Sequence, residues 1–365
     1  MKINHQDYRY PLLDRVEAYF QTEVAPQASR IDQDPEALRG AWQGLGELDA
    51  LALRVPKDWQ GKGLNLLEFA LFQVAIARYS GALAFLQTQH QSAGAMLAQS
   101  ENEGLKQELL PYLAKGEIGV GVGFSQLRRR GVPLMKAKST LEGYVLEGVV
   151  PWITGCGFFD RFIIGALLPS GEAVYGIVPF QNCCRDNGEI SLSEPMSLMA
   201  MPATQTVTAT IQQWFLSRDR VVKITPPDAI DQSDRQNVLK HSFFPLGCAR
   251  AGLDLLQKQY SRKSLPTLQN AYQSLNRELN DCQGSIYQAL QQPPEFWFFE
   301  HHLQLRAWAI NLAGRCAQGA AIAASGAANL TQNPQERVYR EALMFSVFGQ
   351  TEAVLEASLA QLLRL

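Results

Sequence analysis

The feature that most constrains the fold is a glycine-punctuated, strand-like stretch set between long helical patterns. Residues Gly143–Leu168 read GYVLEGVVPWITGCGFFDRFIIGALL. Such β-branched, aromatic and aliphatic runs favour strands, and glycines such as Gly148 and Gly157 interrupt them as turn or bulge residues do. We therefore expect two short strands hinged on Trp152-Ile153-Thr154, inside a protein that is otherwise mainly helical.

The rest of the chain divides at changes of hydrophobic spacing. Apolar residues recur at helical spacing in the first part, as at Leu66, Phe69, Phe72 and Ile76. Glycines and alternating runs then replace this pattern until Pro226-Pro227, after which helical spacing returns and is broken only at prolines. The sequence predicts a helical domain (1–115), a β-domain with a strand at Thr206–Phe215 (116–226), and a bundle of about four helices (227–365).

Bulk properties exclude several classes of protein. A chain of 365 residues with 46% hydrophobic and 19% charged residues can bury a sizeable core. Its formal charge of −2 gives no reason to expect nucleic acid or an anionic membrane as a partner. There is no long apolar run, no signal-peptide core at the N-terminus and no C-x-x-C pair among the 6 cysteines. We expect a cytoplasmic protein without a metal site.

Helices, then a β-domain containing Trp152-Ile153-Thr154, then a bundle, resemble the acyl-CoA dehydrogenase superfamily over essentially the whole chain. The resemblance implies an α+β fold with an N-terminal helical domain, a middle β-domain and a C-terminal four-helix bundle. In that family the Trp-Ile-Thr run lies against a flavin ring, and a strand ending in a hydroxyl residue reaches the flavin. Here Gly121–Ser125 (GVGFS) occupies the place of that strand. The resemblance thus implies flavin contacts from Ser125, Trp152, Ile153 and Thr154.

Other flavin contacts in this family come from a partner subunit, so the resemblance implies a homodimer or homotetramer. The matching stretches here offer Arg262 and Gly326, but the family's Phe-Gly after the arginine and its Gln before the Gly-Gly pair are missing. These positions normally hold the adenine and pyrophosphate of FAD. FAD is therefore the expected cofactor, with FMN and a protein that has lost flavin as alternatives.

The C-terminal region bears on catalysis. Pro334–Ala342 resembles the family's proline followed by Arg-Asp-Ala, and it leads to Phe348-Gly349-Gln350-Thr351, where most dehydrogenases have Tyr-Glu-Gly-Thr. That glutamate is the family's base and removes the α-proton of an acyl thioester, which Gly349 cannot do. Glu352, three residues on, is the candidate for a relocated base. Some members carry the glutamate on the first bundle helix, where the chain has only Asp234 nearby.

A basic loop departs from the family pattern. Arg128, Arg129 and Arg130 replace the acidic, proline and small-residue loop that normally helps to hold the CoA thioester. Three arginines in a row bind phosphate groups well through paired hydrogen bonds. They are equally typical of a solvated surface loop. The sequence leaves both interpretations open.

Three functions remain. The first is a flavin-dependent oxidoreductase of this superfamily acting on a small molecule such as an acyl thioester, although Gly349 argues against conventional α,β-dehydrogenation. The second is a reduced-flavin-dependent monooxygenase, in which Ser125 supplies a hydroxyl and His90 assists near the substrate. The third is a non-catalytic binding or assembly protein. The other histidines are expected to be structural, or terminal in one case: His241, His301, His302 and His5.

Overall fold

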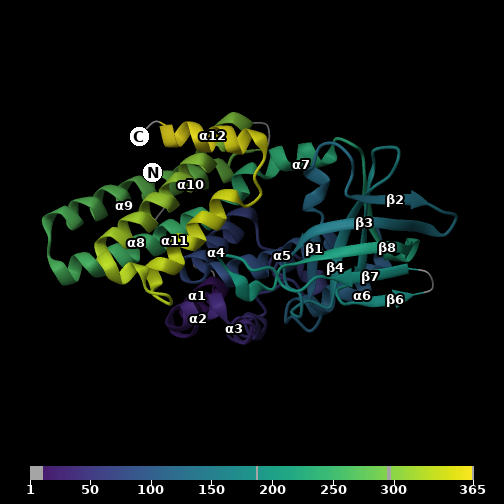
Figure 1. Ribbon diagram of the computed structural model, residues 1–365, viewed down its shortest axis with the longest axis horizontal. Coiled ribbons are helices and arrows are strands. Elements are labelled where there is room, and N and C mark those ends of the chain that lie inside the picture. Colours follow the sequence, from purple (N-terminus) through teal and green to yellow (C-terminus); the bar gives the residue numbers. More distant parts are fainter. Residues whose placement is uncertain (1–10, 186–187, 294–296, 364–365) are drawn as a thin grey trace.

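The computed structural model describes residues 11–185, 188–293 and 297–363. The predicted terminal His5 and the second proline of the Pro293-Pro294 break lie outside these ranges. Helices make up one end of an elongated molecule and a β-sheet the other (Figure 1). Within the described ranges, no helix is both long and apolar enough to cross a membrane.

Side-chain caps set the starts of the N-terminal helices. Asn65 and Glu68 form a reciprocal capping box at the start of α4, and Ser80 Oγ accepts a hydrogen bond from the Leu83 N–H at the start of α5. Proline at the first position begins α3 behind the cap residue Asp34. The N-terminal helices are α1 (Pro11–Tyr19), α2 (Ala28–Gln33), α3 (Pro35–Glu47), α4 (Leu66–Tyr79), α5 (Gly81–Ala98) and α6 (Glu103–Leu113).

In the described part of the chain, 9 strands form one sheet, in the order β6-β7-β8-β3-β2-β4-β5-β9, with β1 pairing alongside β4. Most neighbours are antiparallel, but β1 and β4 are parallel. The strands are β1 (Val120–Gly123), β2 (Met135–Ser139), β3 (Gly143–Ile153), β4 (Arg161–Leu167), β5 (Ala173–Pro179), β6 (Cys183–Arg185), β7 (Gly188–Leu192), β8 (Val207–Ser217) and β9 (Val221–Thr225). The strand expected at Thr206–Phe215 is β8.

Irregular pairing at two places bends β3, the strand that carries Trp152. Its register against β8 shifts between Leu146 and Gly148 and again between Val150 and Ile153. At the first shift, Gly148 has φ +137, and a Cβ there would lie 2.0 Å from the carbonyl oxygen of Leu134, so only glycine fits. Such bulges redirect the end of a strand. They place Trp152 where regular pairing to β8 has been lost.

The C-terminal part is a helical bundle. Helix α8 packs against α10, α9 and α11, while α12 packs on α10 and α4 of the N-terminal helices packs against α8. The helices are α7 (Ala229–Asn237), α8 (Phe243–Lys263), α9 (Pro266–Leu290), α10 (Phe299–Ala324), α11 (Pro334–Val347) and α12 (Glu352–Leu363).

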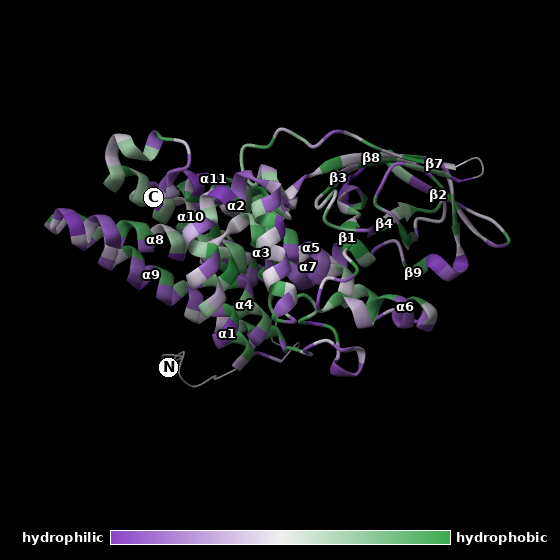
Figure 2. Cartoon of the chain, turned by 90° about the horizontal axis from the view of Figure 1, so that it is seen from below, coloured by the Kyte–Doolittle hydropathy of each residue, from purple (hydrophilic) through white to green (hydrophobic). Residues whose placement is uncertain are grey.

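One large hydrophobic core joins the helices to the sheet. It includes fully buried aromatic residues from all three parts of the chain, among them Phe72, Phe162 and Phe345. Figure 2 shows apolar residues concentrated where helices face one another and polar residues on outer faces. The predicted fold, helical domain, β-domain and helical bundle, is confirmed.

Candidate functional site

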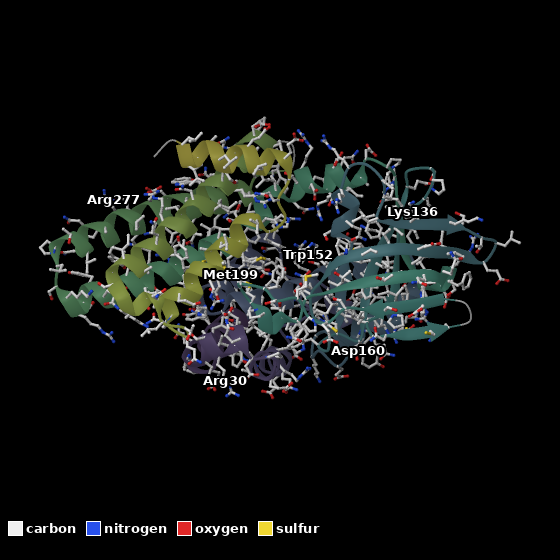
Figure 3. All side chains as sticks on the ribbon, in the orientation of Figure 1. Arg30, Lys136, Trp152, Asp160, Met199 and Arg277 are labelled. Atoms are coloured by element: carbon white, nitrogen blue, oxygen red, sulfur yellow. The ribbon has the colours of Figure 1, made fainter. Side chains whose placement is uncertain are left out.

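Trp152 is the exposed member of the hinge segment at the end of β3. Its side chain is 54% exposed at the junction of sheet and helices, whereas Ile153 and Thr154 are buried (Figure 3). The Thr154 hydroxyl lies 3.0 Å from the hydroxyl of Thr206 and shares a hydrogen bond with it. Of the three predicted ring-contacting side chains, only the indole is available to a ligand without breaking an existing contact.

Ser125 lies directly beyond the end of β1 and is exposed. The next residue, Gln126, is buried, and its amide donates a hydrogen bond to the Gly165 carbonyl of β4 at 2.9 Å. This bond anchors the short 3₁₀ turn η5 (Ser125–Arg128) to the sheet. The turn therefore presents the Ser125 hydroxyl from a fixed backbone.

The three arginines after Ser125 have different surroundings. Arg128 Nε donates to both carboxylate oxygens of Asp234 on α7, at 2.9 and 2.8 Å. Arg129 is exposed, and Arg130 lies 3.6 Å from Glu352 in a pair whose side chains are 92% and 70% exposed. Exposed pairs of this kind contribute little. Arg128 is therefore committed to a protein carboxylate, while Arg129 and Arg130 keep the predicted capacity to bind phosphate.

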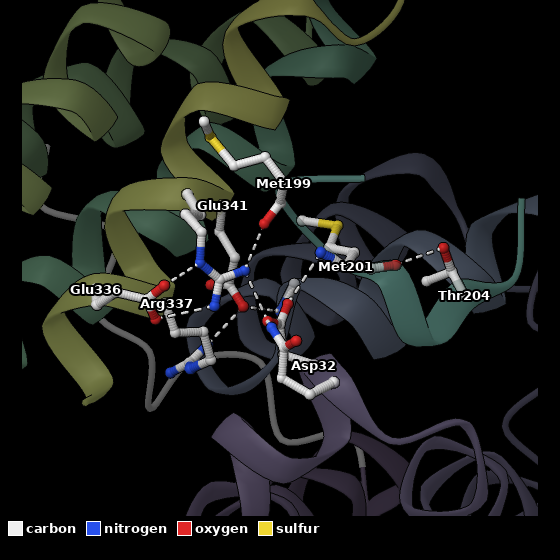
Figure 4. Close-up of polar contacts among 10 residues, drawn as sticks. Asp32, Met199, Met201, Thr204, Glu336, Arg337 and Glu341 are labelled. Carbon is white, nitrogen blue, oxygen red and sulfur yellow. Dashed lines mark hydrogen bonds and ion pairs between the residues drawn. The ribbon is translucent and has the colours of Figure 1, made fainter. Parts of the chain in front are cut away.

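A buried ion network links helix α11 to the segment that precedes β8 (Figure 4). Arg340 of α11 pairs with the fully buried Asp32 of α2 at 2.8 Å and donates to the Met199 carbonyl at 2.8 Å. Asp32 in turn accepts a hydrogen bond from the Met201 N–H at 3.0 Å. Burial opposes the charge of Arg340, but its bonds to Glu336 and Asp32 prevail and raise its pKa. The network fixes the 199–201 segment against α11.

The same segment supports the hinge that carries Trp152. The Gly155 N–H donates to the Thr204 carbonyl at 2.9 Å, and Thr204 itself bonds back to Met201. On the other side, Glu341 of α11 accepts hydrogen bonds from the Gly81 N–H at 2.9 Å and from Arg337 at 2.6 Å. Helix α11 is thereby held to the start of α5 and, through the network, to the hinge.

Gly349 follows α11, and an imidazole ring occupies the space beside it. Its φ is +59, and a Cβ at this position would lie 3.0 Å from the Cε1 and Nδ1 atoms of His241. The rings of His241 and Phe348 pack edge to face, with their centroids 5.1 Å apart. Arg306 of α10 donates from Nη2 to the carbonyls of Phe348 and Gly349, at 2.7 and 3.0 Å. Residue 349 thus has no side chain, and the imidazole of His241 lies where a side chain would begin.

The surroundings of His241 are strongly cationic. Burial lowers the pKa of His241 well below its usual value, and the charges of Arg306, Arg128 and Lys240 add to this. Burial also lowers the pKa of Arg306 to about 10 and, together with Arg54, that of Lys240 to about 8. His241 is therefore a neutral imidazole at neutral pH.

The two carboxylates considered for a relocated base are both engaged. Glu352 begins α12 and is solvent-exposed beside Arg130. Asp234 is bound by Arg128 and is only 16% exposed. The exposed side chain of Glu352 shows no burial that would prepare it to accept a proton, so its catalytic role stays a prediction. Asp234 would have to give up Arg128 to act.

His90 does not belong to the site. It is fully buried in α5, its Nδ1 accepts from the Val120 N–H at 3.0 Å, and its Nε2 lies 3.0 Å from the Leu113 carbonyl. These contacts require the tautomer with the proton on Nε2. Burial lowers its pKa to about 4. This burial argues against the expectation that His90 assists catalysis, because both ring nitrogens bond to the backbone.

Comparisons with known proteins agree with this architecture. Residues 10–117 match the family "Acyl-CoA dehydrogenase, N-terminal domain". The chain is 35% identical over 161 residues to the mitochondrial isovaleryl-CoA dehydrogenase of Bos taurus, a match that covers 42% of this chain and 38% of that protein. It is 27% identical over 226 residues to the human very long-chain specific acyl-CoA dehydrogenase. That match covers 55% of this chain and 34% of the human protein. These matches support the acyl-CoA dehydrogenase superfamily, with the family model matching the N-terminal residues 10–117.

Solved structures of this superfamily share the fold over the full chain. Butyryl-CoA dehydrogenase from Megasphaera elsdenii matches with a TM-score of 0.81 and 17% identity over 100% of both chains. The glutaryl-CoA complex of a glutaryl-coenzyme A dehydrogenase matches with a TM-score of 0.78 and 18% identity, covering 96% and 94%. In sequence, by contrast, the chain matches only about two fifths of its first curated relatives, 38% and 42% of their lengths.

Two residues predicted from the superfamily pattern lie together, far from Trp152. Arg262 is in the last turn of α8, and the neighbouring Lys263 donates to the Ala323 carbonyl at the end of α10, three residues before Gly326. The opposite end of α8 packs against Phe348 through Phe244. A helix of 21 residues spans about 30 Å, so Arg262 is roughly that far from the Gly349 end of the bundle.

No motif in the sequence singles out His241 or Arg306. The pattern around His241 is typical of a structural histidine. One signal was present: Arg306 is a lone charge in the apolar run Leu303–Ala313, which folds as the buried face of α10. A charge in such a run needs a partner. Which partner it meets depends on the tertiary packing of α10 against the loop after α11.

Proposed function

We propose that this protein is a flavin-dependent oxidoreductase of the acyl-CoA dehydrogenase superfamily. The observation that carries the proposal is the exposure of Trp152. Large aromatic side chains bury most of their surface in folded proteins, as Trp214 on the neighbouring strand β8 does at 4% exposure. Trp152, at 54%, leaves a flat indole face uncovered at the junction of sheet and bundle. A planar ring packed there would cover it.

The residues around Trp152 fit a flavin in part. The indole offers a stacking surface, and Ser125 offers an exposed hydroxyl. A flavin there would supply a hydride acceptor, and the protein would orient it and exclude water. Thr154 contributes through its backbone and its support of the hinge, since its hydroxyl is bonded to Thr206.

Conventional α-proton abstraction from position 349 is disfavoured. Gly349 has no side chain, and the ring of His241 fills the space that a longer side chain would need. The monooxygenase alternative keeps Ser125 but loses His90, because that ring is sealed in the core. Oxidation of a small acyl thioester, with a base other than residue 349, is therefore the form of the proposal that we favour.

We further propose that the cofactor is FAD and that a second copy of the chain completes its site. Arg262 and Gly326 lie at the far end of the bundle, so one chain cannot present them to a ring stacked on its own Trp152. In a homodimer or homotetramer, the far end of one bundle can reach the adenine half of a dinucleotide bound to another. An FMN-binding protein would not need these residues.

Flavin binding tests the proposal. The purified protein, mixed with FAD or FMN, should shift the flavin absorbance bands and quench flavin fluorescence, and Trp152→Ala should weaken this binding at least tenfold. Phe215→Ala is the matched control, because Phe215 is also an exposed aromatic residue of the sheet, at 46% exposure. A colourless protein that binds neither flavin would establish the non-catalytic alternative. If a flavin does bind, its bleaching by one of a panel of acyl-CoAs would identify a dehydrogenase substrate.

A further inference from the structure

The cationic cluster around Gly349 lacks a matching negative charge. The cluster comprises the cations Arg306 on α10, Lys240 on the turn η8 (Val238–Ser242) and Arg128 on η5, which surround the neutral ring of His241, also on η8. Asp234 on α7 is the carboxylate that faces it, and Arg128 already binds both of its oxygens. Nearby Glu352 is paired with Arg130 at the surface. Arg306 is thus left without an anionic partner in the described part of the chain.

Arg306 is almost completely buried, and burying a charge that has no anionic partner is energetically costly. It is 2% exposed, it donates only to two backbone carbonyls, and its Nε has no hydrogen-bond partner. The carbonyls belong to the two residues that follow α11, and the dipole of that helix adds at most about half a negative charge at its C-terminal end. Burying a full charge is costly unless it is paired, so half a charge leaves Arg306 uncompensated.

The cluster opens toward solvent on one side. His241 is partly exposed, and the side chain of Arg128 is 33% exposed. Among the described residues, no hydrogen bond to a protein group contributes to the low pKa of the His241 ring. Arg306 and His241 both lie against the Phe348-Gly349 backbone, and they are near enough for the charge of Arg306 to lower the pKa of His241.

We propose that Arg306 and His241 form a binding site for a carboxylate carried by the substrate, with Arg128 adding charge from the rim. The planar fork of an arginine matches the two oxygens of a carboxylate. The inference rests on the proposed function in one respect: it narrows the substrate to acyl thioesters that bear an acidic group. The binding site itself does not depend on flavin.

His241 supplies a readout independent of catalysis. The neighbouring cations hold its pKa low, and a bound anion within about 4–6 Å should raise it by about one unit or more. With ¹³C-labelled histidine, the 5 ring signals of the full-length protein can be titrated, and His241→Gln assigns the one of interest. Propionate is the probe, and propionamide is the control of equal shape without charge.

Propionate should raise the pKa of His241 and propionamide should not. Inorganic phosphate should act at least tenfold more weakly. Equal action of phosphate would overturn the assignment to a carboxylate, and the absence of any shift with propionate would overturn the site. Arg306→Met should abolish the shift, while Arg277→Met, which removes an exposed arginine of α9, should leave it unchanged. Should Arg306→Met fail to fold, Arg128→Gln on the exposed rim should weaken propionate binding severalfold.

A second arm separates this inference from the proposed function. Acyl-CoAs with and without a terminal carboxylate, matched in chain length, are mixed with the flavin-loaded protein. Faster bleaching by the acidic series, lost in Arg128→Gln, is the expected result. Propionate binding without bleaching by any acyl-CoA would refute the oxidoreductase and leave the carboxylate site standing. Bleaching that does not distinguish the two series would refute the acidic substrate.

Discussion

The ring of His241 lies against Gly349 so closely that a Cβ at position 349 would be 3.0 Å from its Cε1 and Nδ1 atoms. The two residues are more than a hundred positions apart in the chain, and Phe348 and Arg306 fix their relative positions. Glycine at residue 349 therefore leaves room for this ring. A longer side chain at residue 349 and the imidazole at residue 241 compete for one space.

Gly349→Ala should destabilise the protein by more than the cost of placing an alanine at a positive φ. A positive φ costs an alanine about 1–2 kcal/mol, and crowding against His241 should add about 1–3 kcal/mol. Urea unfolding measures the total. Gly157→Ala is the matched control, because Gly157 also has a positive φ, +77, but open space where the Cβ would lie. In a His241→Ala background the excess cost should disappear; an unchanged excess would mean that the two residues do not compete.

Stability should fall in acid because of His90. Its folded pKa, about 4, is below its unfolded value near 6.5, so the unfolded state binds the proton more readily. The stabilisation is fully present above about pH 6.5 and is lost as the pH falls toward 4, a loss of order 3 kcal/mol. His90→Asn should flatten this slope in unfolding measured between pH 7 and 4. His301→Asn, on an exposed ring, should leave the slope as in the wild type.

Glu341→Gln should be among the more damaging changes in the chain. It leaves Arg337, whose side chain is 7% exposed, without its anionic partner, and breaking a buried pair from one side costs about 3–5 kcal/mol. Glu36→Gln removes a similarly spaced helical ion pair whose carboxylate is 76% exposed, and it should cost less than about 0.5 kcal/mol. Thermal unfolding compares the two. Equal effects would show that burial of the Arg337–Glu341 pair is energetically unimportant.

Arg262→Gln should distinguish the two flavins. If Arg262 of a second copy holds the adenine half of FAD, the variant should lose about tenfold in FAD affinity and nothing in FMN affinity, because FMN lacks that half. Fluorescence titration with each flavin gives the ratio. Arg277→Gln, another exposed bundle arginine, should bind both as the wild type does. An unchanged ratio for Arg262→Gln would remove this residue from the cofactor site.

The sequence by itself determined the fold and the hinge. Residue spacing in the helices, the glycine-punctuated run around Trp152 and the prolines that separate segments are local signals, and local backbone preferences carry them into structure. They led directly to strands β3 and β8 and to the helical bundle. The resemblance to the superfamily, rather than these local signals, singled out Ser125 and Trp152, whose exposure supports a ligand site at the junction of sheet and helices.

Only the tertiary structure decided what surrounds the hinge and the loop after α11. His90 was a candidate to assist near the substrate, yet packing encloses it between the Leu113 and Val120 backbones. Arg306 and His241 come from separate segments of the bundle and meet at Gly349. The pKa of a side chain and the partners of a buried charge are set by atoms brought near through folding, often from distant parts of the chain. No local pattern of residues encodes that proximity.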